Sequence, residues 1–198
     1  MELLAQLGLA VEVVPQAVAE HRLHGESPQD YVLRLALDKA RAGQGALGSR
    51  PPRPVLGADT AVVLGDRVLG KPADREHALA MLQSLSGTAH RVLSAVAVVG
   101  RDNLGQDREA WRLSETRVRF RRLDAAECEA YWATGEPADK AGGYAIQGRA
   151  ALFVEHIDGS YSGVMGLPLF ETGELLRQFD IQVLAHTEHH QPPRHGDA

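Results

Sequence analysis

The chain of 198 residues contains a single cysteine, Cys128. One cysteine can neither form a disulfide within the chain nor build a cysteine-based zinc site, and we interpret Cys128 as a packing residue of a helix. No apolar run is long enough to cross a bilayer, and the N-terminal residues lack the basic-then-apolar pattern of a secretory signal. These absences predict a cytoplasmic protein with no membrane partner, in a compartment that keeps thiols reduced.

Long basic segments are also missing, and the formal net charge is −5. Binding to nucleic acid regardless of its sequence depends on clustered Lys and Arg, so no nucleic-acid partner is expected. A small anionic ligand needs only a few local cations, and this class of partner remains open. The hydrophobic content of 44% and the charged content of 24% are typical of a globular domain. We predict one domain over residues 1–185 and a disordered, His- and Pro-rich tail over 186–198.

The central feature of the sequence is an apolar run, Val55–Leu64, that is interrupted by one acid, Asp59. A run of this length that is rich in valine predicts a buried strand. Gly57 and Ala58 remove side-chain bulk just before the acid, so another group can approach the backbone there. An ionised carboxylate inside such a strand is costly unless it is paired, bound to a metal or facing a wet cleft. Asp59 is therefore a candidate functional residue, and the alternative is an acid that caps a turn.

The rest of the chain predicts helices and strands in alternation. Ser27, Pro28 and Asp30 mark a helix start, and Asp124 with Glu127 forms a second capping box. Side chains alternate between the two faces of a strand, and here the apolar residues move from one face to the other, which predicts a β-bulge near residues 115–116. The expected elements are a helix over 2–7, a strand over 9–14, a polar loop over 15–26, a helix over 28–46, a hairpin over 61–70, a helix over 74–86, a strand over 92–99, a helix over 124–135, a strand over 152–157 with a return over 160–164, and a helix over 169–179.

Two lysines and one loop are further candidates for binding an anionic ligand. Lys39 falls at the edge of the apolar face of its helix, where its amine could reach a cleft. Lys71 lies in a rigid Gly-Lys-Pro turn near the strand of the central acid. Residues 136–148 form a long loop with adjacent glycines, which let backbone amides approach a ligand, and Gln147 offers a donor and an acceptor suited to the edge of a base. The alternatives are surface lysines and a flexible glycine turn.

Several short motifs occur in a fixed order along nearly the whole chain, from Glu2 to about Phe179. Together they resemble the Maf family of nucleoside triphosphate pyrophosphatases, and the ordered set is more specific than any single motif. The motifs are LGADT at 56–60, GKP at 70–72, Leu85-Ser86-Gly87, DKAGGYAIQG at 139–148, Gly159-Ser160-Tyr161 and Gly166-Leu167-Pro168.

This resemblance implies an α/β fold with an elongated, curved mixed sheet flanked by helices, in which two lobes surround a central cleft as in inosine triphosphatases. It implies hydrolysis of a nucleoside triphosphate between the α and β phosphates, with Mg²⁺ or Mn²⁺ as the cofactor. Asp59 matches the general base of the family. Glu20, which on residue type alone belongs to a solvated loop, matches an acid that binds the metal or the water together with Asp59.

The resemblance also implies which residues bind the substrate. Lys39 and Lys71 match lysines that hold the phosphates, and Lys140 could supply a further positive charge. Thr60 and Gln147 match positions linked to base choice. A glutamine at the latter position resembles the branch that acts on dTTP and UTP, and not the branch that prefers 7-methyl-GTP.

In one respect the chain departs from the family pattern. Family members usually begin with a strand and a Ser-x-Ser-Pro-Arg-Arg loop before the segment that matches Glu2-Leu3-Leu4, and this chain starts at Met1. Without these groups we expect an unpaired sheet edge, lower stability and weaker activity, which an upstream extension should restore. Two alternatives stay open, a non-catalytic nucleotide-binding regulator of cell division or septum formation and a 7-methyl-GTP pyrophosphatase. Family members are often homodimers, so a homodimer is also expected.

Overall fold

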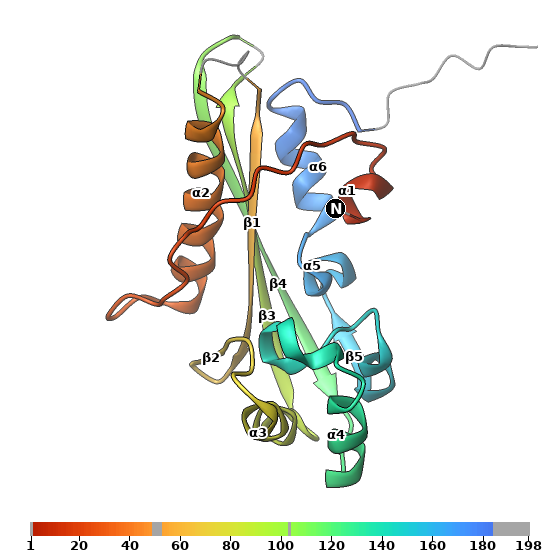
Figure 1. The fold of residues 1–198 in the computed structure, drawn as a ribbon. Helices are drawn as coiled ribbons and strands as arrows, with labels where there is room; N and C mark the ends of the chain where they lie inside the picture. Colours follow the sequence, from red (N-terminus) through yellow and green to blue (C-terminus); the bar gives the residue numbers. More distant parts are fainter. Residues whose placement is uncertain (1, 49–52, 103, 184–198) are drawn as a thin grey trace, which may run out of the picture.

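The computed structural model describes residues 2–48, 53–102 and 104–183. Its centre is a five-stranded sheet with the strand order β2-β1-β3-β4-β5, shown in Figure 1. The strands are β1 (Val55–Leu64), β2 (Arg67–Leu69), β3 (Ala89–Arg101), β4 (Asp107–Phe120) and β5 (Val154–Asp158). The predicted α/β class, an elongated sheet flanked by helices, is confirmed. The predicted disordered tail over 186–198 lies outside the described residues.

All neighbouring strands of this sheet run antiparallel, which corrects the expectation of a mixed sheet. The turn at Gly65-Asp66 joins β1 to β2, as the predicted hairpin requires, and residues 102–106 join β3 to β4. Connections this short can only reverse the direction of the chain, because parallel strands need a long crossover. After a helical excursion, β5 also returns antiparallel to β4.

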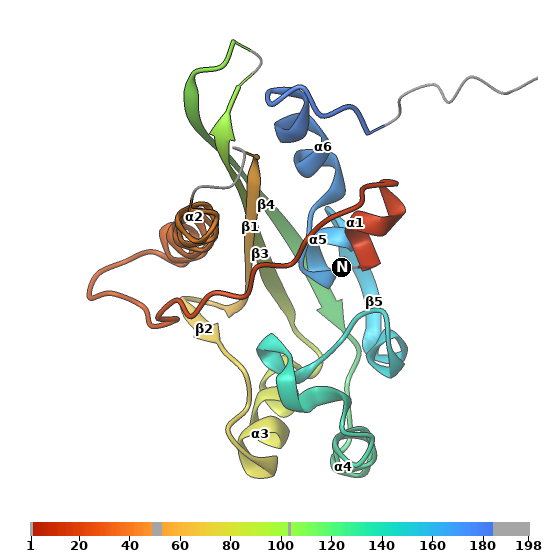
Figure 2. The same cartoon turned by 45° about the horizontal axis from the view of Figure 1, so that its top comes forward.

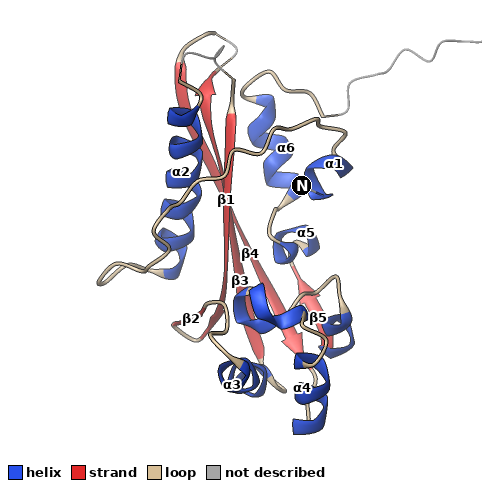
Figure 3. Ribbon diagram, viewed as in Figure 1, coloured by secondary structure: helices blue, strands red, loops and turns tan. Residues whose placement is uncertain are grey.

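Helices cover both faces of the sheet. Ser27 accepts a hydrogen bond from the Asp30 main chain at the start of α2, and Asp124 and Glu127 form the predicted capping box of α4. Figure 3 shows α2 along one side of the sheet, α1 and α6 along the other, and α3 and α4 at the far end. None of the described helices is both long and apolar enough to span a membrane. The helices are α1 (Glu2–Gln6), α2 (Pro28–Ala46), α3 (Arg75–Leu85), α4 (Ala125–Trp132), α5 (Tyr161–Met165) and α6 (Leu169–Arg177).

The two faces of β1 pack against different parts of the chain. Ala61 and Val63 are buried against Ala36 and Ala40 of α2. Ala58, on the opposite parity, packs in a cluster formed largely by α6 and its neighbours. Since side chains alternate along a strand, Asp59 shares the α2 face with Ala61, whereas Thr60 faces the other way.

Part of one edge of β1 has no strand neighbour among the described residues. β3 pairs with Val55–Val63, whereas β2 pairs only with Val62–Leu64. The segment that joins α1 to α2 crosses this region in Figures 1 and 2. A hollow of about 490 Å³ lies between that segment and β1, and Val13, Lys39 and Leu56 are among the residues that line it.

The strand predicted over residues 9–14 is absent, and Figure 3 draws this segment as loop. Val11 and Val13 are 38% and 58% exposed. An alternating pattern forms a strand only where a neighbouring strand supplies hydrogen bonds, and here the segment passes over the sheet without pairing.

Two further local predictions were wrong. The register of β4 on β3 is unbroken through residues 115–116, so the predicted β-bulge is absent there. The even positions of β4 from Ser114 to Phe120 are buried and the odd positions between them are exposed. Trp111, which is 47% exposed, therefore lies on the open face of the strand and marks no change of register. The predicted return strand over 160–164 is helix α5, whose start is capped by Ser160.

Candidate functional site

Three of the predicted site residues meet on the α2 face of β1. Lys39 Nζ lies 2.7 Å from Asp59 Oδ1 and 2.7 Å from Glu20 Oε1. Asp59 belongs to β1, Lys39 to α2, and Glu20 to the segment between α1 and α2. The side chain of Asp59 is only 10% exposed, whereas that of Glu20 is 46% exposed. The lysine therefore pairs a nearly buried acid with an acid at the surface.

Close packing of α2 on β1 brings the lysine to the acid. A Cβ atom on Gly57 would lie 2.3 Å from the Ala36 carbonyl oxygen and 2.6 Å from the Ala40 nitrogen. Only glycine therefore lets the helix backbone approach this closely, as the sequence predicted. Gly57 and Asp59 share a face of the strand, and Lys39 directly precedes Ala40, so its amine reaches the carboxylate.

The surroundings of the two acids shift their pKa values in opposite directions. Burial raises the pKa of Asp59, although the hydrogen bond from Lys39 acts against this shift. The hydrogen bond from Lys39 lowers the pKa of Glu20, and burial opposes it only in part. Burial acts to lower the pKa of Lys39, but its hydrogen bonds to Asp59 and Glu20 outweigh burial and leave that pKa raised. One carboxylate is thus held ionised, and the other is better suited to accept a proton.

Lys71, another predicted site residue, lies in the turn after β2. Its side chain is exposed. Its positive charge acts to lower the pKa values of Glu20 and Asp59, but this effect is smaller than those of Lys39 and of burial, and the pKa of Asp59 stays raised. The main-chain nitrogen of Gly142 donates to the Gly70 carbonyl at 3.0 Å, so the turn is attached to the glycine-containing loop. The positive charge of Lys71 therefore acts on both acids, whereas no hydrogen bond or ion pair joins it to either of them among the described residues.

Thr60 is not brought to Lys39. Its Oγ1 lies 2.9 Å from Ser94 Oγ of β3, and Ser94 in turn donates to the Gly163 carbonyl of α5. These hydrogen bonds hold the Thr60 hydroxyl on the sheet face opposite Asp59.

The loop over residues 136–148 presents two predicted site residues near its surface. Lys140 forms an ion pair of 2.7 Å with the exposed Asp139. Gln147 is exposed in a turn. The hydrogen bond of Lys140 lowers the pKa of Asp139, and the charge of Lys71 contributes to the same shift. The charge of Lys71 therefore affects the pKa of an acid in this loop as well as those of Glu20 and Asp59.

The two acids fit a hard divalent cation. Their oxygens converge on one point, which the Lys39 ammonium fills, and carboxylate oxygens are preferred ligands of Mg²⁺ and Mn²⁺. Within the described ranges no cluster of three or more His, Cys, Asp and Glu side chains could hold a metal ion. Mg²⁺ is commonly held by one or two carboxylates, with water and substrate phosphates as the other ligands. Glu20 and Asp59 are therefore a suitable protein share of such a site.

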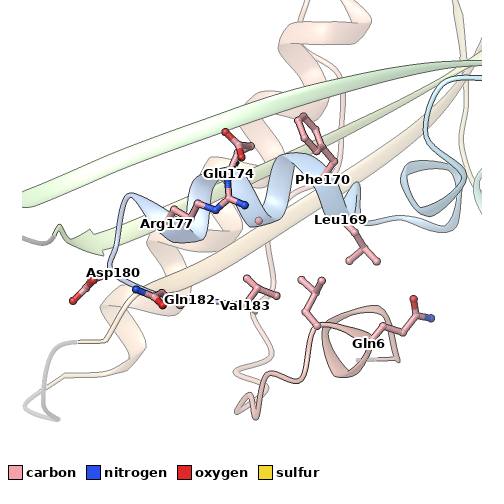
Figure 4. Close-up of a pocket in the computed structure, with 10 residues that line it drawn as sticks. Gln6, Leu169, Phe170, Glu174, Arg177, Asp180, Gln182 and Val183 are labelled. Carbon is pink, nitrogen blue, oxygen red and sulfur yellow. Dashed lines mark hydrogen bonds and ion pairs between the residues drawn. The ribbon is translucent and has the colours of Figure 1, made fainter. Parts of the chain in front are cut away.

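A second hollow, of about 520 Å³, lies against α6 and the end of α1 (Figure 4). Phe170, Glu174 and Arg177 of α6 are among its lining residues, together with Gln6 of α1. None of the predicted site residues lines it, and it is separate from the acids.

Sequence reasoning missed a residue that supports the acid-bearing loop. The Tyr31 hydroxyl donates to the Glu20 main-chain carbonyl at 3.2 Å. No motif marks this contact, because it joins an irregular segment to the first turns of a helix. The only available signal was that Tyr31 and Arg34 lie on one helix face, three residues apart.

Comparison with known proteins gives concordant matches. The family model for Maf-like proteins matches residues 1–179. The chain is 58% identical over 188 residues to the dTTP/UTP pyrophosphatase of Alkalilimnicola ehrlichii, which covers 93% of this chain and 90% of that protein. It is 52% identical over 183 residues to the enzyme of the same name from Saccharophagus degradans (92% and 85% covered). For the Bordetella avium dTTP/UTP pyrophosphatase the identity is 53% over 186 residues (91% and 90% covered). The similarity thus extends over nearly all of each chain.

Proposed function

Because the chain belongs to the Maf-like protein family, we propose that it is a hydrolase that splits dTTP and UTP into the nucleoside monophosphate and pyrophosphate with a divalent metal. The observation that carries this proposal is the contact of Lys39 with both Glu20 and Asp59. In the proposed reaction the nearly buried Asp59 is the base, Glu20 is a metal-binding acid and Lys39 is a phosphate-binding cation. The names of the relatives support the choice of pyrimidine nucleotides.

In the proposed reaction Asp59 takes a proton from a water molecule. The water oxygen attacks the α-phosphorus, the bond from that phosphorus to the oxygen bridging to the β-phosphate breaks, and pyrophosphate leaves. Lys39, Lys71 and Lys140 stabilise the negative charge on the phosphates. At ~4 Å and an effective dielectric of ~20, each such contact contributes on the order of 4 kcal/mol before desolvation. A bound Mg²⁺ or Mn²⁺, held by Glu20 and Asp59, would polarise phosphate oxygens and neutralise their charge.

Gln147 reads the edge of the pyrimidine base from the exposed loop. Thr60 contributes to base choice through the main chain of β1, since its hydroxyl is hydrogen-bonded to Ser94.

We also propose that the protein works in the cytoplasm, without a nucleic-acid or membrane partner, and forms a homodimer. Light scattering of the purified chain measures its mass and tests the last point.

A substrate panel tests the proposed function directly. Pyrophosphate release is measured from dTTP, UTP and 7-methyl-GTP with Mg²⁺ and with Mn²⁺, before and after chelation with EDTA. We expect release from dTTP and UTP that stops on chelation and returns on addition of metal. A preference for 7-methyl-GTP would overturn the proposed base choice. Nucleotide binding by calorimetry without any product would instead identify a non-catalytic binding protein.

The variant Asp59→Asn tests the base. It keeps the shape of the side chain but removes its ability to take a proton, so turnover should fall about 10²-fold or more. The control is Asp66→Asn in the exposed turn between β1 and β2, which should retain turnover. If the asparagine variant at position 59 remains folded and keeps most of its turnover, Asp59 is not the base.

A further inference from the structure

The segment that carries Glu20 has no regular secondary structure, so its position depends on individual contacts. Residues 20–26 are mostly exposed, and a loop of this kind is mobile unless it is tied down. Glu20 must nevertheless reach Lys39 on α2 to form the acid pair. The contacts that fix this loop therefore decide where one of the two acids lies.

Glu26 is the principal attachment of the loop. Its carboxylate accepts two hydrogen bonds from Arg34 of α2, at 2.6 Å from Nε and 2.9 Å from Nη2. It also accepts one from the main-chain nitrogen of Leu23 at 2.9 Å. The Glu26 side chain is only 8% exposed. A two-pronged pair with this geometry is stronger and more directional than a single surface ion pair.

The same part of α2 holds the rest of the loop. Arg34 Nη2 donates to the His21 carbonyl at 3.0 Å, and the Tyr31 hydroxyl donates to the Glu20 carbonyl. Arg22 Nε donates to the Glu26 carbonyl at 2.6 Å. Both ends of residues 20–26 are thus bonded to residues one turn apart on a rigid helix.

We propose that Glu26 is a positioning residue, which through Arg34 holds Glu20 opposite Lys39 and Asp59 and thereby sets the affinity of the site for the divalent metal that accompanies the nucleotide. This inference rests on the proposed function. Glu26 itself touches neither acid, and its effect on the site passes through the loop backbone. Supporting contacts of this kind commonly change metal affinity by roughly 10–100-fold.

The test compares Glu26→Gln with a control that breaks a second arginine–glutamate pair of the same helix. Arg41 of α2 makes an equivalent two-pronged pair with Glu109 of β4, at 2.9 and 2.6 Å, but no part of the loop depends on it. Calorimetry measures the affinity for Mn²⁺ in the presence of a non-hydrolysable α,β-methylene analogue of dTTP. Glu26→Gln should weaken Mn²⁺ binding on the order of tenfold, and Glu109→Gln should leave it unchanged. Equal Mn²⁺ affinities in the two variants would overturn the proposal.

Arg34→Lys separates geometry from charge. It keeps the positive charge but loses the paired hydrogen bonds, so it should weaken Mn²⁺ binding in the same direction as Glu26→Gln. Wild-type affinity in Arg34→Lys would show that charge alone suffices and would overturn the positioning role.

Amide hydrogen exchange measures how firmly the loop is held, and it depends neither on metal binding nor on turnover. The amides of residues 20–26 should exchange faster in Glu26→Gln than in the wild type and in Glu109→Gln. If exchange is unchanged, Glu26 does not hold the loop and the proposal fails. If the wild type binds no nucleotide or yields no product, the proposed function fails, and the exchange comparison still decides whether Glu26 fixes the loop.

Discussion

At the scale of single residues, the site depends on one lysine that serves two acids. Asp59 is nearly buried, and an ionised carboxylate in that position is costly without a partner. Lys39 provides that partner and at the same time binds Glu20 at the surface. Removal of the lysine would leave burial as the dominant influence on the pKa of Asp59, because the charge of Lys71 lowers that pKa less than Lys39 does.

The variant Lys39→Met tests this balance. Lys39 at present lowers the pKa of Asp59 against the effect of burial, so its loss should raise that pKa further. The measurement is a ¹³C NMR titration of the Asp59 carboxyl group in the variant and in the wild type. The control is Lys140→Met, which removes a lysine paired with the exposed Asp139. It should leave the pKa of Asp59 unchanged. An Asp59 pKa that falls or stays constant in Lys39→Met would contradict the pairing seen in the structure.

The sequence indicated these residues to different degrees. Asp59 was identifiable because an acid inside an apolar run requires a physical explanation, and Lys39 because its helical position fell at the edge of a buried face. Glu20 was identifiable only by resemblance, since nothing distinguishes it locally from other loop acids. The roles of Glu26 and Arg34 were not predictable, because their pairing depends on how an irregular loop folds back onto a helix.

At the scale of elements, the site is built by the approach of α2 to β1. At Gly57 the two backbones lie so close together that a side chain would overlap with the helix backbone. The backbone of α2 is held by its own hydrogen bonds, so it cannot yield locally as a flexible side chain would. The distance between helix and strand is therefore coupled to the contact between Lys39 and Asp59.

The variant Gly57→Ala should both destabilise the protein and disturb the site. The added Cβ would force α2 away from β1, and overpacking of this kind costs about 1–3 kcal/mol. Denaturant unfolding gives the stability, and pyrophosphate release gives the activity, which should also fall. The control is Gly45→Ala on α2, where nothing lies within 4 Å of the added atom. This substitution should be neutral or stabilise the protein by up to ~1 kcal/mol. Equal effects of the two substitutions would refute the close contact.

Elements were predictable where the sequence itself determines local hydrogen bonding. The starts of α2 and α4 followed from Ser27 and from the Asp124–Glu127 box, because caps act within one turn. The segment over 9–14 was wrongly predicted as a strand, since pairing needs a neighbour that the pattern does not reveal. Ser160 was likewise predicted to lie in a strand, but its hydroxyl accepts a hydrogen bond from the Gly163 main-chain nitrogen and caps the start of a helix.

At the scale of the whole molecule, one buried histidine links the far end of the sheet to the loop over 136–148. His90 of β3 is 2% exposed, and its Nε2 lies 2.8 Å from the Tyr144 hydroxyl of that loop. Its ring also makes edge contacts with Phe120 and Tyr144, with centroids 5.0 and 5.5 Å apart. Burial lowers the pKa of His90 from 6.5 to about 4, so the folded protein keeps this ring neutral where the unfolded chain binds a proton.

The stability of the fold should therefore fall as the pH is lowered from 6.5 to 4. In that interval the unfolded chain takes up a proton at His90 before the folded protein does, so protonation favours unfolding, and the loss reaches about 3 kcal/mol by pH 4. The double variant His90→Leu/Tyr144→Phe removes both polar partners together, which avoids leaving one unsatisfied. Urea unfolding at several pH values between 7 and 4 should show a shallower decline in the variant than in the wild type. Because slopes are compared, a uniform loss from repacking does not matter. Parallel declines would mean that other groups, such as Glu26 with its pKa lowered to about 2 chiefly by hydrogen bonds from Arg34, govern acid stability instead.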